Sequence, residues 1–232
     1  MILNIIICVF NEEKTINELL NQVLNVSLEE KVKKNIIILD NNSTDNTKLI
    51  LEKNFSNNNN IKIIYNKKNI GKGGSLIKSL NYCKEGLVVF QDADLEYDPN
   101  NYNDLIDELL KNNCDAVFGS RVLKGTNYHV YSLNKIAVNI FSVLINFFYN
   151  TNFTDTATNH KLIKLECLKK MKLDSKSFAI DFEIAIKLGK LQYKCSEIKI
   201  DYFPRTYEDG KKISLIDAYK SLYVIFKNLF TK

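Results

Sequence analysis

The sequence lacks paired cysteines. Its 232 residues contain five cysteines, an odd number, and none of them form a CxxC pair. This spacing argues against a disulfide framework and against a structural zinc site. The expected compartment is therefore the reducing cytoplasm, with a peripheral position at the cytoplasmic face of the membrane as an open alternative.

A leader peptide and a membrane span are also missing from the pattern. Residues 1–10 carry no basic segment ahead of the apolar run, so they are expected to form a strand and not a signal peptide. The longest apolar stretch covers residues 136–149 and is interrupted by Asn139 and Asn146. A membrane-spanning helix takes ~20 apolar residues, so this stretch is expected to be a buried or interfacial helix.

Two common nucleotide-binding motifs are absent as well. The sequence has no GxxxxGK(S/T) segment and no GxGxxG after its first apolar run, which argues against a P-loop protein and a nicotinamide dehydrogenase. With 2 prolines and 8 glycines it has no linker rich in Pro, Gly or Ser, so residues 1–232 are expected to form a single domain. The mild net charge of +5 fits an anionic substrate, a weak attraction to an anionic membrane, or a surface with spare lysines. No nucleic-acid partner is expected.

The first half of the sequence alternates apolar β-branched runs with amphipathic stretches. Strands are predicted at residues 4–10, 35–39, 61–65, 87–91 and 115–119, with helices at 13–24, 45–55, 73–83 and 99–111. This order predicts an α/β fold with a mostly parallel, Rossmann-like central sheet flanked by helices. The second half is mixed, with helices at 133–148, 166–171, 181–191 and 214–230 and strands at 161–163 and 196–203.

Acidic residues follow several of these strands, at the edge where ligands bind in parallel sheets. Glu12 follows the first and Asp40 the second. After the fourth, the acids of the segment 92–96 (DADLE) alternate and would share one face of an extended chain. Hard oxygen ligands suit Mg²⁺ or Mn²⁺. An acidic cap on the helix near Pro99 is the alternative.

Small and polar residues open two of the predicted helices. Glycines at Gly71 and Gly73 would let the backbone approach a ligand, and a helix N-terminus favours anions. In the segment 40–45, Asn42, Ser43 and Thr44 are expected to cap a helix, whereas Asp40 is expected to have a functional role.

Seven segments together carry a resemblance to a known family. In chain order they are residues 5–13 (IIICVFNEE), 39–45 (LDNNSTD), 69–73 (NIGKG), 92–96 (DADLE), 119–121 (GSR) with Gly125, 155–161 (DTATNHK) and 202–213 (YFPRTYEDGKKI). The chain resembles family 2 glycosyltransferases of the GT-A fold, close to the dolichol-phosphate mannosyltransferase and polyprenyl-phosphate glycosyltransferase group. It departs from that pattern at Cys8, at Asn41 and Asn42, and at Glu96.

The resemblance implies roles for particular residues. The nucleotide sugar would be bound by Phe10, Glu12, Asp40, Asn41, Gly71, Lys72, Asp92, Ala93, Asp94 and Lys211. Asp92, Asp94 and Glu96 would hold the metal, and Arg121 and Arg205 would meet phosphate; Asp92, Asp94, Arg121 and Arg205 are the implied catalytic residues. The segment 203–213, with Gly210 as a hinge and Lys212 adding charge, would close over the donor or form an exposed turn.

The implied activity is transfer of a sugar, with inversion, from a UDP- or GDP-sugar to a polyprenyl or dolichyl phosphate. Residues 1–120 would bind the nucleotide sugar and residues 121–232 the acceptor. A saccharide hydroxyl acceptor in cell-surface glycan synthesis would need a general base, for which Asp155, Asp181 and Glu183 are candidates. A nucleotidyltransferase and a sugar-nucleotide-binding protein without turnover also remain open. The amphipathic C-terminal stretch could lie on a membrane, pack in the core, or form a homodimer face.

Overall fold

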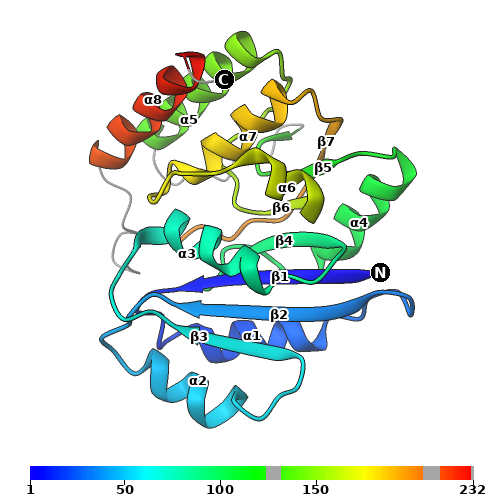
Figure 1. The fold of residues 1–232 in the computed structure, drawn as a ribbon, viewed down its shortest axis with the longest axis vertical. Coiled ribbons are helices and arrows are strands. Elements are labelled where there is room, and N and C mark those ends of the chain that lie inside the picture. The colour runs from blue at the N-terminus through cyan, green and yellow to red at the C-terminus, as the bar shows by residue number, and fades with distance from the viewer. Residues whose placement is uncertain (124–131, 206–214, 231–232) are drawn as a thin grey trace.

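The computed structural model describes residues 1–123, 132–205 and 215–230. Within them, a seven-stranded sheet has the strand order β3-β2-β1-β4-β6-β5-β7 (Figure 1). The strands are β1 (Ile2–Val9), β2 (Lys33–Asp40), β3 (Ile61–Tyr65), β4 (Leu87–Asp92), β5 (Ala116–Ser120), β6 (Lys161–Lys164) and β7 (Cys195–Lys199). β6 runs antiparallel to its neighbours β4 and β5, and the other strand pairs are parallel. The predicted α/β fold with a mostly parallel sheet is confirmed.

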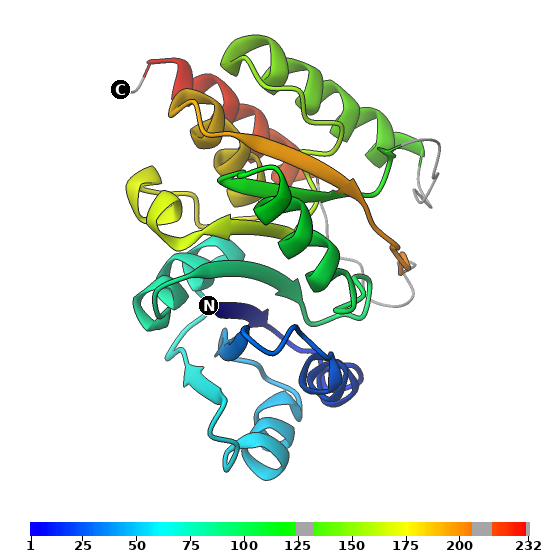
Figure 2. The same ribbon diagram turned by 90° about the vertical axis from the view of Figure 1, so that its right-hand side faces the viewer.

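Helices cover both faces of this sheet (Figures 1 and 2). They are α1 (Ile16–Asn25), α2 (Thr47–Phe55), α3 (Gly71–Ser79), α4 (Asn101–Lys111), α5 (Ser132–Tyr149), α6 (Leu165–Met171), α7 (Ile180–Lys190) and α8 (Leu215–Phe230), with a 3₁₀ turn η1 (Leu80–Tyr82). Side chains alternate across β1: Leu3, Ile5 and Ile7 pack with α1, α2 and α4, whereas Ile6 packs with α3 and the C-terminal helices. Burial of both faces explains the apolar runs of the central strands β1 and β4.

One predicted strand is shorter than expected. The alternating pattern predicted a strand over residues 196–203, but β7 ends at Lys199. Its partner β5 ends at Ser120, which is the last residue paired with β7. The chain then crosses the end of the sheet, where Tyr202 forms an isolated bridge with Tyr97. This crossing brings residues 200–205 to the carboxyl ends of β1 and β4.

Two helices of the second half present apolar residues to solvent. α5 and α8 lie in contact, side by side in both views (Figures 1 and 2). On α8, Tyr219 is 71% exposed and Tyr223 57%, while Val224 and Ile225 face the core. The prediction that the apolar face of this C-terminal stretch packs in the core is therefore wrong for Ile216, Tyr219, Tyr223 and Phe226. In the part of the chain that the structure describes, no helix is long and apolar enough to cross a membrane.

Candidate active site at the carboxyl edge of the sheet

Glu12 is held at the end of β1 by its neighbours. The preceding residue, Asn11, has a left-handed backbone with φ of 56°. The Glu12 amide donates to the Thr47 hydroxyl at 2.9 Å, and the Glu12 carboxylate accepts a hydrogen bond from Arg205 at 3.2 Å. Glu12 therefore joins the end of β1 to the segment that crosses the sheet after β7.

The acidic segment after β4 is a turn. Leu95 has a φ of 62°, and the Glu96 amide donates to the Asp94 carboxylate at 3.2 Å. The expectation that Asp92, Asp94 and Glu96 share one face of an extended chain is therefore wrong, because the left-handed residue reverses the direction of the chain. Asp92 and Asp94 lie at the edge of the sheet and are partly exposed, with 24% and 14% of their side chains accessible.

Glu96 is buried, and both of its carboxylate oxygens have partners in the segment that follows β7. One of its carboxylate oxygens accepts a hydrogen bond from the Tyr202 hydroxyl, and the other accepts one from the Arg205 amide at 2.8 Å. Among the described residues, no group of three His, Cys, Asp or Glu side chains is placed to hold a metal ion. The expected three-carboxylate cluster is not formed, and Glu96 instead anchors the segment that carries Arg205.

Asp92 is paired with Lys72 from the first turn of α3. The Lys72 ammonium lies 3.2 Å from the Asp92 carboxylate and 3.3 Å from Asp181 at the start of α7. Burial alone would lower the pKa of Lys72, but the carboxylates of Asp181 and Asp92 outweigh it and raise that pKa. For Asp92 the balance is reversed, since burial and the nearby acids raise its pKa although Lys72 opposes them.

Asp94 is paired with Arg205. The guanidinium lies 2.7 Å from the Asp94 carboxylate and 3.2 Å from that of Glu12, so it bridges the ends of β4 and β1. Burial, followed by the charges of Asp92 and Glu96, raises the pKa of Asp94 to about 7, against the opposing charge of Arg205. For both aspartates, the paired cation therefore only partly opposes the burial and the nearby acids that raise the pKa.

This donor set fits a divalent metal. Asp92 and Asp94 offer hard carboxylate oxygens, and a bound dication would favour their ionised forms, against the burial and the neighbouring acids that raise both pKa values. Phosphate oxygens and water would have to complete the coordination, as is usual for Mg²⁺.

Two further expected residues lie at the end of β2. The Asp40 carboxylate is 2% exposed and accepts hydrogen bonds from the amide and the hydroxyl of Ser43. The amide group of Asn41 is used within the protein, with Asn66, Asn69 and Ile70 as its partners. Asn41 therefore shapes the loop before α3. Phe10 is half-buried beside them.

The capping interpretation of residues 42–44 is wrong. The Ser43 hydroxyl bonds to Asp40, and Thr44 bonds to Asn11. α2 begins only at Thr47, whose amide donates a hydrogen bond to the Asp45 carboxylate at 3.0 Å. The segment thus ties the end of β1 to the end of β2 before the helix starts.

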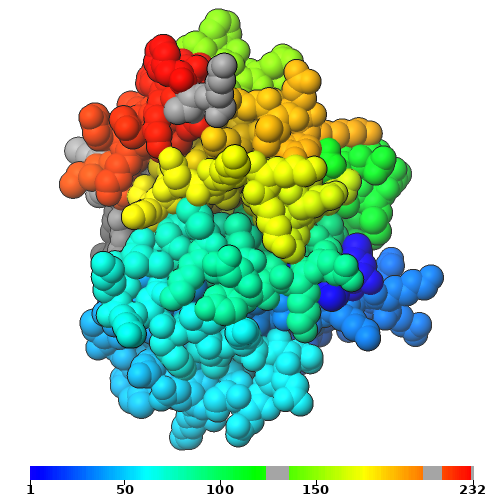
Figure 3. All heavy atoms as spheres, viewed as in Figure 1, coloured from blue at the N-terminus to red at the C-terminus, as the bar shows by residue number. Residues whose placement is uncertain are grey.

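The glycines that open α3 approach protein backbone. Gly71 has a φ of 78°, and a Cβ there would lie 2.1 Å from the Lys176 carbonyl oxygen. A Cβ on Gly73 would lie 2.1 Å from the Ser175 carbonyl oxygen. These two glycines therefore let α3 pack against the segment that leads into α7, and in Figure 3 the yellow of that segment meets the turquoise of α3. Contact of Gly71 with a ligand stays a prediction.

Arg121 follows β5 and is held by Asp155. Its guanidinium donates to both Asp155 oxygens, at 2.7 and 2.8 Å, and it lies over the Tyr202 ring at 5.1 Å. The Asp155 side chain is fully buried. Burial alone would raise the pKa of Asp155, but the Arg121 charge outweighs it and lowers that pKa. Contact of Arg121 with phosphate remains a prediction.

The candidate bases are all engaged in other contacts. Asp155 is paired with Arg121, and Asp181 lies between Lys72 and Lys161. Glu183 accepts hydrogen bonds from the backbone amides of residues 174 and 175. The buried ring of His160 packs between two tyrosines, and burial lowers its pKa to about 3.

Two contributors were not predicted from the sequence. Tyr202 positions Glu96, and the fully buried Lys161 pairs with Asp181 at 3.2 Å. A lysine opening the apolar run of residues 161–163 was the signal available for Lys161. Gly125 and the predicted contributors Gly210, Lys211 and Lys212 lie outside the described residues.

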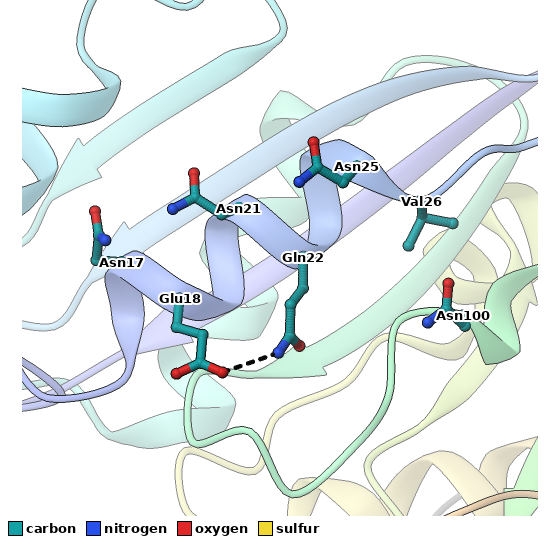
Figure 4. A pocket seen from close by; sticks show the side chains of 7 residues that line it. All are labelled: Asn17, Glu18, Asn21, Gln22, Asn25, Val26 and Asn100. Atoms are coloured by element: carbon teal, nitrogen blue, oxygen red, sulfur yellow. Dashed lines mark hydrogen bonds between the residues drawn. The ribbon is translucent and has the colours of Figure 1, made fainter.

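A shallow polar hollow of about 510 Å³ lies apart from this edge, between α1 and the start of α4 (Figure 4). It is lined by Asn17, Glu18, Asn21, Gln22, Asn25, Val26 and Asn100. None of the expected site residues is among them, and all but Val26 are exposed. The hollow is a surface depression and takes no part in the site.

Solved structures share this fold. Glucosyl-3-phosphoglycerate synthase from Mycobacterium tuberculosis, in complex with Mn²⁺, UDP-glucose and phosphoglyceric acid, matches with a TM-score of 0.71 and 14% identity, over 99% of this chain and 80% of that one. S. aureus TarS in complex with UDP-GlcNAc matches with a TM-score of 0.66 and 20% identity, over 97% and 65% of the two chains. At these identities the likeness shows the GT-A fold alone.

Sequence comparison identifies relatives at higher identity. The chain is 31% identical to Uncharacterized protein MJ0544 of Methanocaldococcus jannaschii, over 94% of both chains. It is 29% identical to dolichyl-phosphate beta-glucosyltransferase of Dictyostelium discoideum, over 91% of this chain and 68% of the relative. The family model of glycosyl transferase family 2 matches residues 4–172, which include the ends of β1, β2, β4 and β5. The chain belongs to glycosyl transferase family 2.

Proposed function

We propose that this protein transfers a sugar from a UDP- or GDP-sugar to a polyprenyl phosphate, with inversion and with Mg²⁺ or Mn²⁺ as cofactor. The observation that carries the proposal is the pairing at the carboxyl edge, where each of two partly exposed aspartates lies beside a cation. Lys72 pairs with Asp92 and Arg205 with Asp94. A diphosphate with a bound metal brings a positive and a negative group together. The aspartates would bind the metal, and Lys72 and Arg205 would face the phosphate oxygens.

The rest of the edge fits a nucleotide sugar. Glu12 follows β1, which pairs with β4, and Asp40 ends β2 on the other side of β1. Carboxylates at these positions can accept hydrogen bonds from ribose or base. In this proposal residues 1–120 bind the donor and residues 121–232 bind the acceptor. Lys211, and Phe10 beside Glu12, complete the proposed donor contacts, and Arg121 contributes to phosphate binding.

The proposed reaction is a single displacement. An acceptor oxygen forms a bond to the anomeric carbon while the bond from that carbon to the diphosphate oxygen breaks, and the electron pair leaves with the nucleoside diphosphate. A bound metal would supply positive charge that stabilises the negative charge on that leaving group. Arg205 and Lys72 lie where they can stabilise the same charge through hydrogen bonds already oriented in the site.

A phosphate acceptor is favoured by the state of the candidate bases. A saccharide hydroxyl must lose a proton to a nearby base, whereas a phosphate is already ionised. Asp155, Asp181 and Glu183 are each engaged in ion pairs or backbone hydrogen bonds. The name of the Dictyostelium relative, dolichyl-phosphate beta-glucosyltransferase, supports the same acceptor class.

A lipid-linked acceptor also gives a role to the apolar surface of α5 and α8. Val143 and Phe147 on α5 are 67% and 79% exposed, beside the exposed tyrosines of α8. Two adjoining apolar helix faces with tyrosines are typical of interfacial binding. Flotation with anionic liposomes tests this part of the proposal: cofloating protein at low salt is expected, and a dimer in solution with no cofloating protein would contradict it.

The donor is tested by thermal unfolding with a panel of UDP- and GDP-sugars and Mn²⁺. A ligand that binds the folded state at about 100 times its Kd stabilises that state by about 2.7 kcal/mol, so one donor series is expected to raise the Tm. No shift with any donor would count against the activity.

The aspartate assignment is tested by Asp94→Asn in a transfer assay with a short polyprenyl phosphate. Removing a metal ligand at the leaving group is expected to lower kcat by about 10³-fold, in line with the loss of a major electrostatic contribution. Asp107→Asn on the exposed face of α4 is the matched control and is expected to leave transfer unchanged. Normal transfer by Asp94→Asn would falsify the assignment.

A further inference from the structure

We propose that Lys161 and Asp181 form a buried positioning pair that holds Lys72 at the diphosphate site, so that Lys72 stays in place when Asp92 turns to a metal. This inference rests on the proposed function and extends it to two residues that touch neither the donor nor the acceptor.

The pair begins inside the core. Lys161 opens β6, and its side chain is fully buried. Its ammonium lies 3.2 Å from one Asp181 oxygen, donates to the Thr158 carbonyl, and sits over the Phe118 ring at 5.0 Å. A buried ammonium of this kind is held only where its partners are fixed, because leaving it unpaired is costly.

The other Asp181 oxygen reaches the active-site edge. It lies 3.3 Å from the Lys72 ammonium, which lies 3.2 Å from Asp92. The four side chains therefore form a line of alternating charge, from Lys161 in the core through Asp181 and Lys72 to Asp92 at the edge. They come from β6, α7, α3 and β4, so the line joins the second half of the chain to the first.

The backbone around this line is fixed by close packing. The Gly74 amide donates to the Lys176 carbonyl oxygen at 3.3 Å, and a side chain at Gly71 or Gly73 would overlap the backbone of residues 175 and 176. The start of α3 is thereby set against the segment that enters α7. Asp181 and Lys72 keep their separation because neither helix end can shift without breaking this contact.

The arrangement matters because Lys72 has two anionic partners with different fates. Asp92 is a proposed metal ligand, so its charge is shared with the metal once the donor binds. Asp181 is not a proposed metal ligand, so it remains a partner of Lys72. A lysine ammonium on a flexible four-carbon chain loses position readily when one partner leaves. Lys161 bonds one Asp181 oxygen from the core side, which leaves the other oxygen for Lys72.

The test uses Asp181→Asn, Lys161→Met and the double variant in the full chain. Asp181→Asn alone leaves Lys161 buried without its counter-charge, so its Tm is expected to fall. The double variant removes both charges and is expected to regain most of that Tm. Its kcat is expected to stay ten- to a hundredfold below that of the wild type, with a smaller change in KM, because Lys72 is misplaced. Recovery of both Tm and kcat in the double variant would show a purely structural pair and overturn the proposal.

A second comparison isolates the route through Lys72. If the pair acts by positioning Lys72, adding the two substitutions to Lys72→Met is expected to lower kcat no further than Lys72→Met alone, since residues acting as a unit are not additive. Independent, multiplicative losses would overturn the proposal. If Asp181→Asn does not fold, this comparison still stands, because it uses only the double variant and Lys72→Met.

A readout that needs no donor separates this inference from the proposed activity. In the wild type, the ammonium protons of Lys72 are expected to exchange slowly and to give a resolved side-chain NMR signal, assigned with Lys72→Met. That signal is expected to broaden or vanish in the double variant. An unchanged signal would overturn the positioning role, whereas absence of transfer by the wild type would overturn only the proposed function.

Discussion

The two arginines at the carboxyl edge differ in how their charge is used. Arg121 donates from its guanidinium to the buried carboxylate of Asp155 through two hydrogen bonds of 2.7 and 2.8 Å. Arg205 spreads its guanidinium between Asp94 and Glu12 at 2.7 and 3.2 Å, and 21% of its side chain is exposed. Both residues were predicted to meet phosphate, and their surroundings now distinguish them.

The difference suggests how each arginine behaves when a ligand arrives. The partners of a buried bidentate ion pair are expected to stay together, because separating them would leave an unpaired charge out of contact with water. Arg205 is shared between Glu12 and Asp94, and a metal would neutralise Asp94, so Arg205 can exchange that carboxylate for a phosphate at small cost. Arg121 is therefore expected to support the fold mainly, and Arg205 to support the reaction mainly.

The largest expected effect is on stability, from Arg121→Met. Breaking a buried ion pair by removing one partner typically costs about 3–5 kcal/mol, because the remaining charge stays buried. The Asp155 side chain is fully buried, which places this pair in that class. Urea unfolding measures the loss. The double variant Arg121→Met with Asp155→Asn is the control and is expected to recover much of it; a loss below about 1 kcal/mol for the single variant would place the pair with exposed ion pairs instead.

The next effect is on transfer, from Arg205→Ala. Loss of one preoriented donor at a developing charge typically lowers kcat by about 10²–10³-fold, and kcat/KM is expected to fall by about 10² here. The free energy of unfolding is expected to change less than in Arg121→Met, because the acids around Arg205 are closer to solvent. Arg205→Lys keeps the charge without the planar guanidinium, and its kcat/KM is expected to lie between those of the wild type and Arg205→Ala. If Arg205→Ala destabilised the protein more than Arg121→Met, the contrast between the arginines would be reversed.

The sequence predicted those features that depend on the order of elements. Glu12 follows β1, and Asp40 and Asp92 end β2 and β4. Parallel pairing of these strands brings their ends together whatever the packing above them. The strand and helix pattern followed from apolar periodicity for the same reason. These predictions required only local patterns and the general geometry of parallel sheets.

The sequence did not predict features that depend on one backbone angle or on a distant contact. The three-acid face failed because Leu95 adopts a left-handed φ, which a leucine rarely does. The Lys161–Asp181 pair requires β6 and α7 to be adjacent, and the sequence of neither segment predicts this contact. The close approach of Gly71 to the Lys176 backbone was not predicted, because a glycine can make room for protein backbone as readily as for a ligand.

The smallest expected effect is on pH dependence, where the two carboxylates paired with the arginines should behave in opposite ways. The raised pKa of Asp94, about 7, means that the folded, metal-free protein binds a proton that the unfolded chain has lost. Its contribution to stability is therefore present at low pH and lost as the pH rises through about 7. The lowered pKa of Asp155 gives a contribution that is present above the ordinary carboxyl pKa and lost only in stronger acid.

The ionisation of Asp94 should also set the pH dependence of metal binding. A carboxylate must be deprotonated to bind a metal, so the affinity for Mn²⁺ with a nucleoside diphosphate is expected to fall by up to about tenfold for each pH unit below 7. Calorimetric titration at pH 6 and pH 8 measures this, with Tm values of the metal-free protein taken over the same range. In Asp94→Asn, both the fall in affinity attributable to this group and the gain in Tm on acidification should disappear. A pH dependence that persists unchanged in Asp94→Asn would assign the titration to another residue and leave Asp94 ionised beside Arg205.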